Sequence, residues 1–161
     1  MFPHPRLRSG RIELEEDSLK KVMNDPHNLQ RFLDAQNHVY DQAHAELEGG
    51  RKTSHWMWFI FPQIQGLGSS EMARHYAISS LGEARAYLEH PVLGDRLREC
   101  TRLVNRIEKR PIEEIFPYPD DLKFRSSMTL FARAAADNAV FLDALNKNFG
   151  GEFDRQTLER L

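Results

Sequence analysis

An unbroken run of six apolar residues at positions 56–61 constrains this chain more than any other stretch. It holds both tryptophans of the protein, Trp56 and Trp58. A surface helix or a half-exposed strand would alternate apolar and polar residues, so most of this run is expected to be buried. Ser54 is a suitable N-cap and Pro62 a suitable stop, which favours one or two helical turns over a strand.

The polar residues that border the run leave two interpretations open. Lys52 and His55 lie on its N-terminal side, and Gln63 follows it. A tryptophan buries a large ring but must also satisfy its indole N–H, and such clusters are typical of pocket walls. The run is therefore either a central core segment with ordinary polar flanks or one wall of a ligand pocket.

Length and composition limit the class of protein. A chain of 161 residues with 40% hydrophobic and 29% charged residues predicts one globular domain. The net charge of −2 argues against a nucleic-acid partner. The single cysteine, Cys100, cannot form an internal disulfide and predicts a cytoplasmic setting. No apolar run is long enough for a secretory signal or a membrane span, so no membrane partner is expected.

Metal and cofactor signals are weak. None of the seven histidines lies three or four residues from another histidine or from the cysteine, so no metal site is expected. The pair Gly66-x-Gly68 is a faint phosphate-loop cue. It lacks the further glycine and the preceding strand of a dinucleotide fingerprint, and no cofactor is predicted.

Helix signals follow one another through the chain and predict an all-α fold, a compact bundle of about six to eight helices. Residues 1–24 are expected to form a flexible, charged arm and residues 25–161 a single helical domain. Asp25-Pro26 is a start signal and Gly49-Gly50 a stop signal, which predicts one helix between them. A capping box at residues 80–83 opens another. Further helices are predicted over about 71–78, 91–109, 111–116, 120–135, 138–148 and 154–161, with Ser69 or Ser70 as the cap of the first and Asp154 as the cap of the last.

Several polar residues fall on faces that the spacing predicts to be apolar. Gln36 lies in the stripe of the first helix, and Arg96 on the inner face of the helix at 91–109. Arg125 and Ser126 lie in a helix with apolar residues on most sides. Buried polar groups need partners. These residues either make structural hydrogen bonds and ion pairs or face a pocket that holds an anion.

Several motifs resemble the bacterial family called domain of unknown function 1810. The most specific is the block His-Trp-Met-Trp-Phe-Ile-Phe-Pro-Gln at residues 55–63; others stand at residues 29–36, 76–78, 90–94 and 123–131. The resemblance covers roughly residues 25–161 and implies a small α-helical bundle. It implies no particular activity. The label calpastatin, sometimes attached to members, implies repeated disordered inhibitory segments, which this sequence lacks.

A more distant similarity concerns the superfamily of N-glycosidase-like proteins associated with NAD and ADP-ribose. Gln36, Trp56, Trp58 and Met128 are similar in order to residues of that superfamily. Its Trp-x-x-x-Glu-His signature is absent here. The similarity therefore implies a kind of ligand but not a shared reaction.

Two hypotheses of different classes follow. In the first, the protein binds or processes a small anionic, nucleotide-like molecule related to NAD or ADP-ribose, with His55 and Gln36 as candidate catalytic residues. The candidate ligand-binding residues are Lys52, Trp56, Trp58, Gln63, Arg96, Arg125 and Ser126. In the second, the tryptophan block of a non-catalytic module docks an unidentified protein partner or a second copy of the chain.

Overall fold

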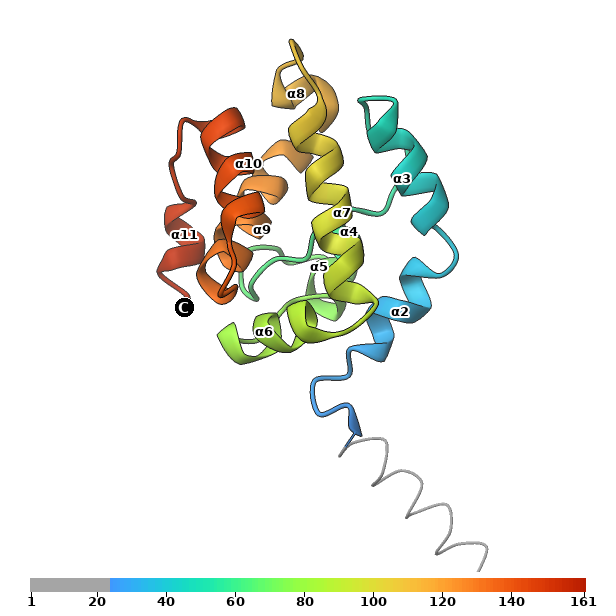
Figure 1. The fold of residues 1–161 in the computed structure, drawn as a ribbon. Coiled ribbons are helices and arrows are strands. Elements are labelled where there is room, and N and C mark those ends of the chain that lie inside the picture. The colour runs from blue at the N-terminus through green and yellow to red at the C-terminus, as the bar shows by residue number, and fades with distance from the viewer. Residues whose placement is uncertain (1–23) are drawn as a thin grey trace, which may run out of the picture. The chain divides into compact units, whose positions relative to one another are not determined.

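The computed structural model describes residues 24–161. The predicted arm at residues 1–24 therefore lies almost wholly outside the described residues, and residues from Phe32 to Leu161 form one compact unit. Residues 24–161 form ten helices, six of them with seven or more residues (Figure 1). The all-α prediction is confirmed for this part of the chain, where one isolated bridge, between Ile64 and Ile78, is the only β pairing. The helix count exceeds the predicted six to eight.

The predicted first helix is two helices, α2 (Gln30–Gln36) and α3 (Tyr40–Glu48). Residues 37–39 separate them. This Asn-His-Val triplet consists of three residues of low helix propensity, which the start and stop signals at the ends do not reveal. The Asp25 carboxylate accepts hydrogen bonds from the N–H groups of Leu29 and Gln30, at 2.7 and 2.9 Å, so it still caps the chain entering α2.

The apolar run forms the short helix α4 (Met57–Ile60), as predicted. Its N-cap is Trp56, which makes no side-chain capping bond. The prediction that Ser54 caps this helix is wrong, because the Ser54 hydroxyl donates to Glu46 instead. The ring of Phe61, which follows α4, meets those of Phe116 and Phe124 edge-on, with centroids 5.7 and 5.0 Å apart. These contacts place the run in an aromatic core.

Two serine caps predicted from the sequence open the next helices. Ser70 caps α5 (Glu71–His75), and Ser80 caps α6 (Leu81–Glu89) by accepting a hydrogen bond from the Glu83 N–H at 3.1 Å. In a capping box the glutamate side chain accepts a hydrogen bond from the N–H of the cap residue. Here the Glu83 carboxylate accepts from the N–H and hydroxyl of the preceding residue, Ser79. Ser80 therefore caps the helix, while Ser79 donates to the glutamate of the box.

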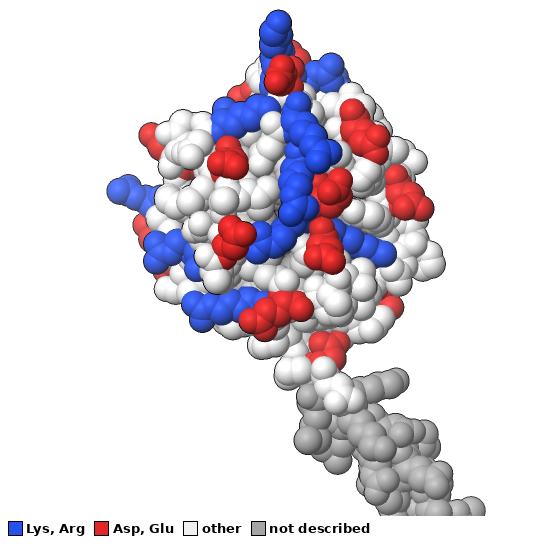
Figure 2. Space-filling model, in the orientation of Figure 1, with Lys and Arg blue, Asp and Glu red and all other residues white. Residues whose placement is uncertain are grey.

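Helix α7 (Leu93–Arg106) begins in direct contact with the end of α6. A side chain at Gly94 would place its Cβ 2.1 Å from the Leu88 carbonyl oxygen, so only glycine allows this approach. The outer face of α7 carries Arg98, Arg102 and Arg106 at intervals of about one turn. Figure 2 shows a line of basic side chains over α7, with acidic side chains beside it. Charges of both signs therefore share this face.

The second half of the chain surrounds one buried helix, α9 (Asp120–Ala134), which follows the single turn α8 (Ile112–Ile115). Ten of the fifteen α9 residues are buried. It packs against α6, α10 (Ala139–Phe149) and α11 (Arg155–Leu158) (Figure 1). Asp154 caps α11, as predicted. No helix in residues 24–161 is long and apolar enough to span a membrane.

Candidate ligand-binding site

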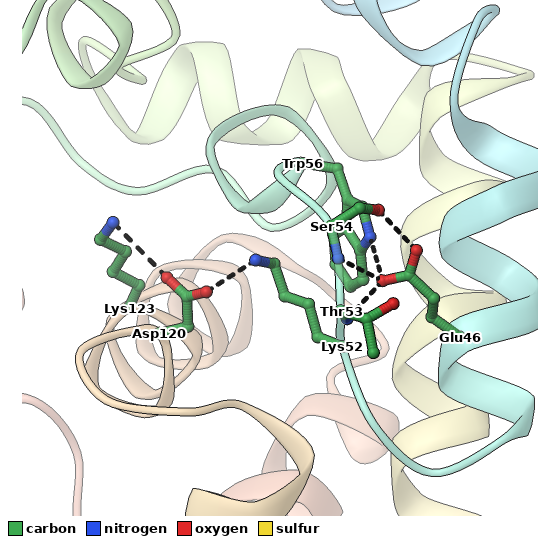
Figure 3. Close-up of polar contacts among 7 residues, drawn as sticks. All are labelled: Glu46, Lys52, Thr53, Ser54, Trp56, Asp120 and Lys123. Atoms are coloured by element: carbon green, nitrogen blue, oxygen red, sulfur yellow. Dashed lines mark hydrogen bonds and ion pairs between the residues drawn. The ribbon is translucent and has the colours of Figure 1, made fainter.

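Glu46 on α3 organises the chain that leads into the tryptophan block (Figure 3). Its Oε1 accepts hydrogen bonds from the main-chain N–H groups of Thr53 and Ser54, at 2.6 and 2.9 Å, and from Trp56 Nε1 at 3.0 Å. Its Oε2 accepts from the Ser54 hydroxyl and from Gln42 Nε2. One buried carboxylate therefore satisfies five donors and fixes residues 53–56. We call Glu46 and residues 53–56 the clamp.

These bonds keep Glu46 ionised. Burial by itself raises the pKa of the carboxyl, but the hydrogen bonds from Ser54, Thr53 and Gln42 outweigh it and lower the pKa to about 2. A carboxylate that accepts this many donors is stable as an anion inside the protein.

Two lysines share the carboxylate of Asp120 at the start of α9 (Figure 3). Lys52 Nζ lies 2.7 Å from Oδ2, and this lysine is almost fully buried. Lys123 Nζ lies 3.5 Å from Oδ1 and is more exposed. Each ammonium also lies over an indole ring, Lys52 over Trp56 at 5.3 Å from the centroid and Lys123 over Trp58 at 5.1 Å. Because Lys52 already neutralises Asp120, the three groups together keep one positive charge, carried by the more exposed Lys123.

A cleft of about 460 Å³ opens beside Lys123 and the half-buried ring of Trp58. Four residues that the sequence singled out line it: Trp58, Gln63, Arg125 and Ser126. Its other lining residues are Leu67, Gly68, Ser69, Ser70, Ala73, Pro119, Leu122, Lys123, Asp154 and Gln156. The cleft therefore combines an aromatic wall with basic, acidic and amide groups, a composition typical of small-molecule sites.

Part of the polar lining is committed to the fold. Arg125 donates from Nε and Nη2 to the main-chain oxygens of Glu152 and Phe153, and Nη2 also pairs with the Glu152 carboxylate at 3.2 Å. The Ser126 hydroxyl donates to the Leu122 carbonyl oxygen or to Asp154 Oδ2, each at 3.1 Å. These bonds fasten the segment before α11 to α9.

Other polar atoms of the lining are available. Within residues 24–161 no hydrogen bond involves the Gln63 side-chain amide, Arg125 Nη1 or Asp154 Oδ1, although Asp154 Oδ2 accepts three. Together with Lys123 Nζ, these atoms give the cleft donors, an acceptor and a cation without disturbing the fold.

The comparisons with known proteins bear on the family. The family model described as "Protein of unknown function (DUF1810)" matches residues 26–161. The chain belongs to this family. The expected resemblance is thus confirmed. A crystal structure of the conserved hypothetical protein Rv1873 from Mycobacterium tuberculosis is similar to this chain, with 58% identity and a TM-score of 0.84. The match covers 85% of this chain and 98% of that one. No curated protein shows significant similarity.

The remaining predicted site residues of this DUF1810 member lie away from the cleft. Gln36 is buried; its amide donates to the Phe59 carbonyl oxygen at 2.7 Å and to the Tyr87 hydroxyl at 2.9 Å. Arg96 lies over the Tyr40 ring at 4.7 Å and donates to the Gln36 side-chain oxygen at 3.4 Å. The structure thus gives both residues structural partners that join α2, α4, α6 and α7.

Trp56 and its neighbours Lys52 and His55 also lie outside the cleft. Trp56 is fully buried in the clamp, and Lys52 is paired with Asp120. His55 is exposed and does not line the cleft. The structure therefore does not bring the two candidate catalytic residues, His55 and Gln36, together with the cleft. A catalytic role for either stays a prediction.

The sequence interpretation missed Lys123, Asp154 and Glu46. A usable signal existed for Lys123, because it lies three residues before Ser126 and so on the same face of a helix. Asp154 was recognised only as a helix cap. Glu46 had no local signal, since its partners at residues 53–56 lie beyond the turn that ends α3.

Proposed function

We propose that the cleft binds a small anionic molecule of the nucleotide class. The observation that carries this proposal is the position of Lys123, whose ammonium lies over the half-buried Trp58 ring and only 3.5 Å from a carboxylate that Lys52 already holds at 2.7 Å. A cation beside an aromatic wall offers the two contacts that a phosphate and a base need.

The other available atoms suit the rest of such a ligand. The ammonium of Lys123 and Nη1 of Arg125 would donate charge-assisted hydrogen bonds to a phosphate. Asp154 Oδ1 would accept from a sugar hydroxyl, and the Gln63 amide would pair with a base edge. Because Arg125 Nη1, Asp154 Oδ1 and the Gln63 side-chain amide have no partner to lose in residues 24–161, and Lys123 holds Asp120 only at 3.5 Å, binding would cost little rearrangement of the described fold.

The first test is a thermal-shift panel of AMP, ADP, ADP-ribose, NAD and sugar phosphates. A ligand at about 100 times its dissociation constant adds about 2.7 kcal/mol to the free energy of unfolding, which a domain of this size displays clearly. The variant Lys123→Met keeps the aliphatic stem over Trp58 and removes the charge. Lys109→Met, at an exposed lysine outside the cleft, is the matched control.

A shift that Lys123→Met abolishes and Lys109→Met preserves would support the proposal. The absence of a shift with every anion, or an equal loss in both variants, would refute it. Quenching of tryptophan fluorescence gives a second readout, because Trp58 lines the cleft and Trp56 does not.

Large apolar side chains near the cleft favour a second candidate function, a protein-interaction module. Leu122 lines the cleft and is 48% exposed, and Tyr118 on the preceding turn is 78% exposed. Such residues are common anchors of protein interfaces. Sedimentation velocity of the wild-type protein and of Leu122→Ser tests whether a second copy is the partner; identical monomeric profiles would count against self-association.

A further inference from the structure

A second hollow of about 610 Å³ adjoins the cleft. Its lining consists of Gln65, Gly66, Gly68, Ala73, Arg74, Ala77 and Arg160. Gly68 and Ala73 line the cleft as well, so the two hollows share one wall.

The shared wall consists of two small residues in close contact, Gly68 and Ala73. A Cβ placed on Gly68 would lie 2.7 Å from the Cβ of Ala73, closer than two carbon atoms can approach without a shift. One glycine and one methyl group are therefore all that separates the hollows at this point. We call this pair the saddle. A larger residue at position 68 would push the two segments apart.

The charge of the second hollow is positive. Arg74 is exposed, and its guanidinium has no partner within residues 24–161. Arg160 uses Nη2 to donate to the Gly66 carbonyl oxygen at 3.1 Å, which leaves its other N–H groups available on this side of the loop. No Asp or Glu is among the lining residues. Two arginines without an adjacent lining carboxylate are suited to an anion that binds through a planar, bidentate contact.

We propose that this hollow is a second anion subsite, and that the ligand is a nucleotide with an additional phosphate group that crosses the saddle. The inference rests on the proposed function, because the cleft would hold the base and the first phosphate. The loop at residues 65–70, with the Gly66-x-Gly68 pair, supplies lining residues to both hollows. The Arg74 and Arg160 guanidinium groups would bind the additional phosphate.

Calorimetric titration with matched probes tests this subsite. AMP carries one phosphate; ADP and adenosine 3′,5′-bisphosphate each carry a second, in different positions. We expect at least one of these two doubly phosphorylated probes to bind the wild-type protein about 10-fold more tightly than AMP, the effect of a hydrogen-bonded charge. The double variant Arg74→Ala/Arg160→Ala should lose this gain and bind AMP as the wild type does.

Two further variants serve as controls. Arg74→Ala alone removes a side chain that has no partner in the described fold, so it should lose part of the gain even if Arg160 is needed to hold the loop. Arg155→Ala removes an exposed arginine of α11 that lines neither hollow and should change nothing.

The outcomes separate the two proposals. If AMP binds and neither doubly phosphorylated probe gains affinity through Arg74 and Arg160, the subsite is refuted while the cleft stands. If the double variant binds AMP and the doubly phosphorylated probes more weakly by the same factor, the subsite is also refuted, since the loss would reflect the general field of the surface. If no probe binds the wild-type protein, both proposals fail.

Discussion

The clamp and the cleft each contain one of the two tryptophans and differ in how their polar atoms are used. In the clamp, the Glu46 carboxylate and all the donors that face it are paired, and Trp56 is fully buried. In the cleft, the Gln63 side-chain amide and Asp154 Oδ1 have no partner within residues 24–161, and Trp58 is half-buried. A saturated network stabilises a fold, whereas available groups on a rigid wall can bind a ligand. Two tryptophans only two residues apart therefore lie in different surroundings.

The largest expected effect belongs to the clamp. Glu46→Ala would leave the N–H groups of Thr53 and Ser54 and the indole N–H of Trp56 without an acceptor. Each buried donor without a partner costs about 1–3 kcal/mol, and some will find water, so we expect the free energy of unfolding to fall by about 4 kcal/mol. Urea denaturation measures this. A loss below about 1 kcal/mol would show that the clamp is dispensable.

The contribution of the Glu46 carboxylate should also appear in the pH dependence of the free energy of unfolding. The pKa of Glu46 is about 2 in the folded protein against an ordinary value of 4.5, so its contribution is complete above pH 4.5 and is lost as the pH falls toward 2. The shift corresponds to about 3 kcal/mol. Glu46→Gln should therefore flatten the fall of unfolding free energy over this window. A variant with the wild-type slope between pH 4.5 and 2 would contradict the assignment.

A matched pair of variants compares the two lysines that contact Asp120, one next to the clamp and one beside the cleft. Lys52→Met removes a buried partner at 2.7 Å, and we expect a loss of about 2 kcal/mol, because Lys123 still neutralises part of the charge. Lys123→Met removes a looser partner at 3.5 Å and should cost less than about 1 kcal/mol. Thermal denaturation of both variants tests the order. Equal losses would mean that Lys123 is as structural as Lys52.

The smallest expected changes in stability concern two separate glutamines, Gln36 in the core and Gln63 in the cleft. Gln36→Leu removes hydrogen bonds to the Phe59 carbonyl oxygen and the Tyr87 hydroxyl and should lower the free energy of unfolding by about 1.5 kcal/mol. Gln63→Leu removes an amide without a partner in the described residues and should change it by less than about 0.5 kcal/mol. Destabilisation by Gln63→Leu equal to that by Gln36→Leu would show that the cleft amide is also structural.

Local signals predicted most of the helices. The Ser70, Ser80 and Asp154 caps are where the sequence placed them, because a cap depends on residues within one turn. The break between α2 and α3 was missed, since weak helix formers in a helical pattern do not by themselves end a helix. Trp58, Gln63, Arg125 and Ser126 were brought to one cleft, as a pocket wall requires.

The division between clamp and cleft could not be predicted from local sequence. Lys52 and Lys123 are both lysines beside aromatic residues, and only the fold decides which of them lies closer to Asp120. Glu46 reaches residues 53–56 across a turn closed by Gly50, whose φ of 82° lies in the left-handed region. Contacts of this kind depend on how helices pack, which periodicity does not encode.

The most direct test of this division uses the indole N–H signals of the two tryptophans in a ¹H–¹⁵N spectrum, assigned with Trp58→Phe. On titration with ADP-ribose, we predict that the Trp58 signal moves and the Trp56 signal stays, while the Trp56 N–H, bonded to Glu46, exchanges slowly with D₂O. Movement of the Trp56 signal alone, or no movement of the Trp58 signal with any nucleotide of the panel, would contradict the account.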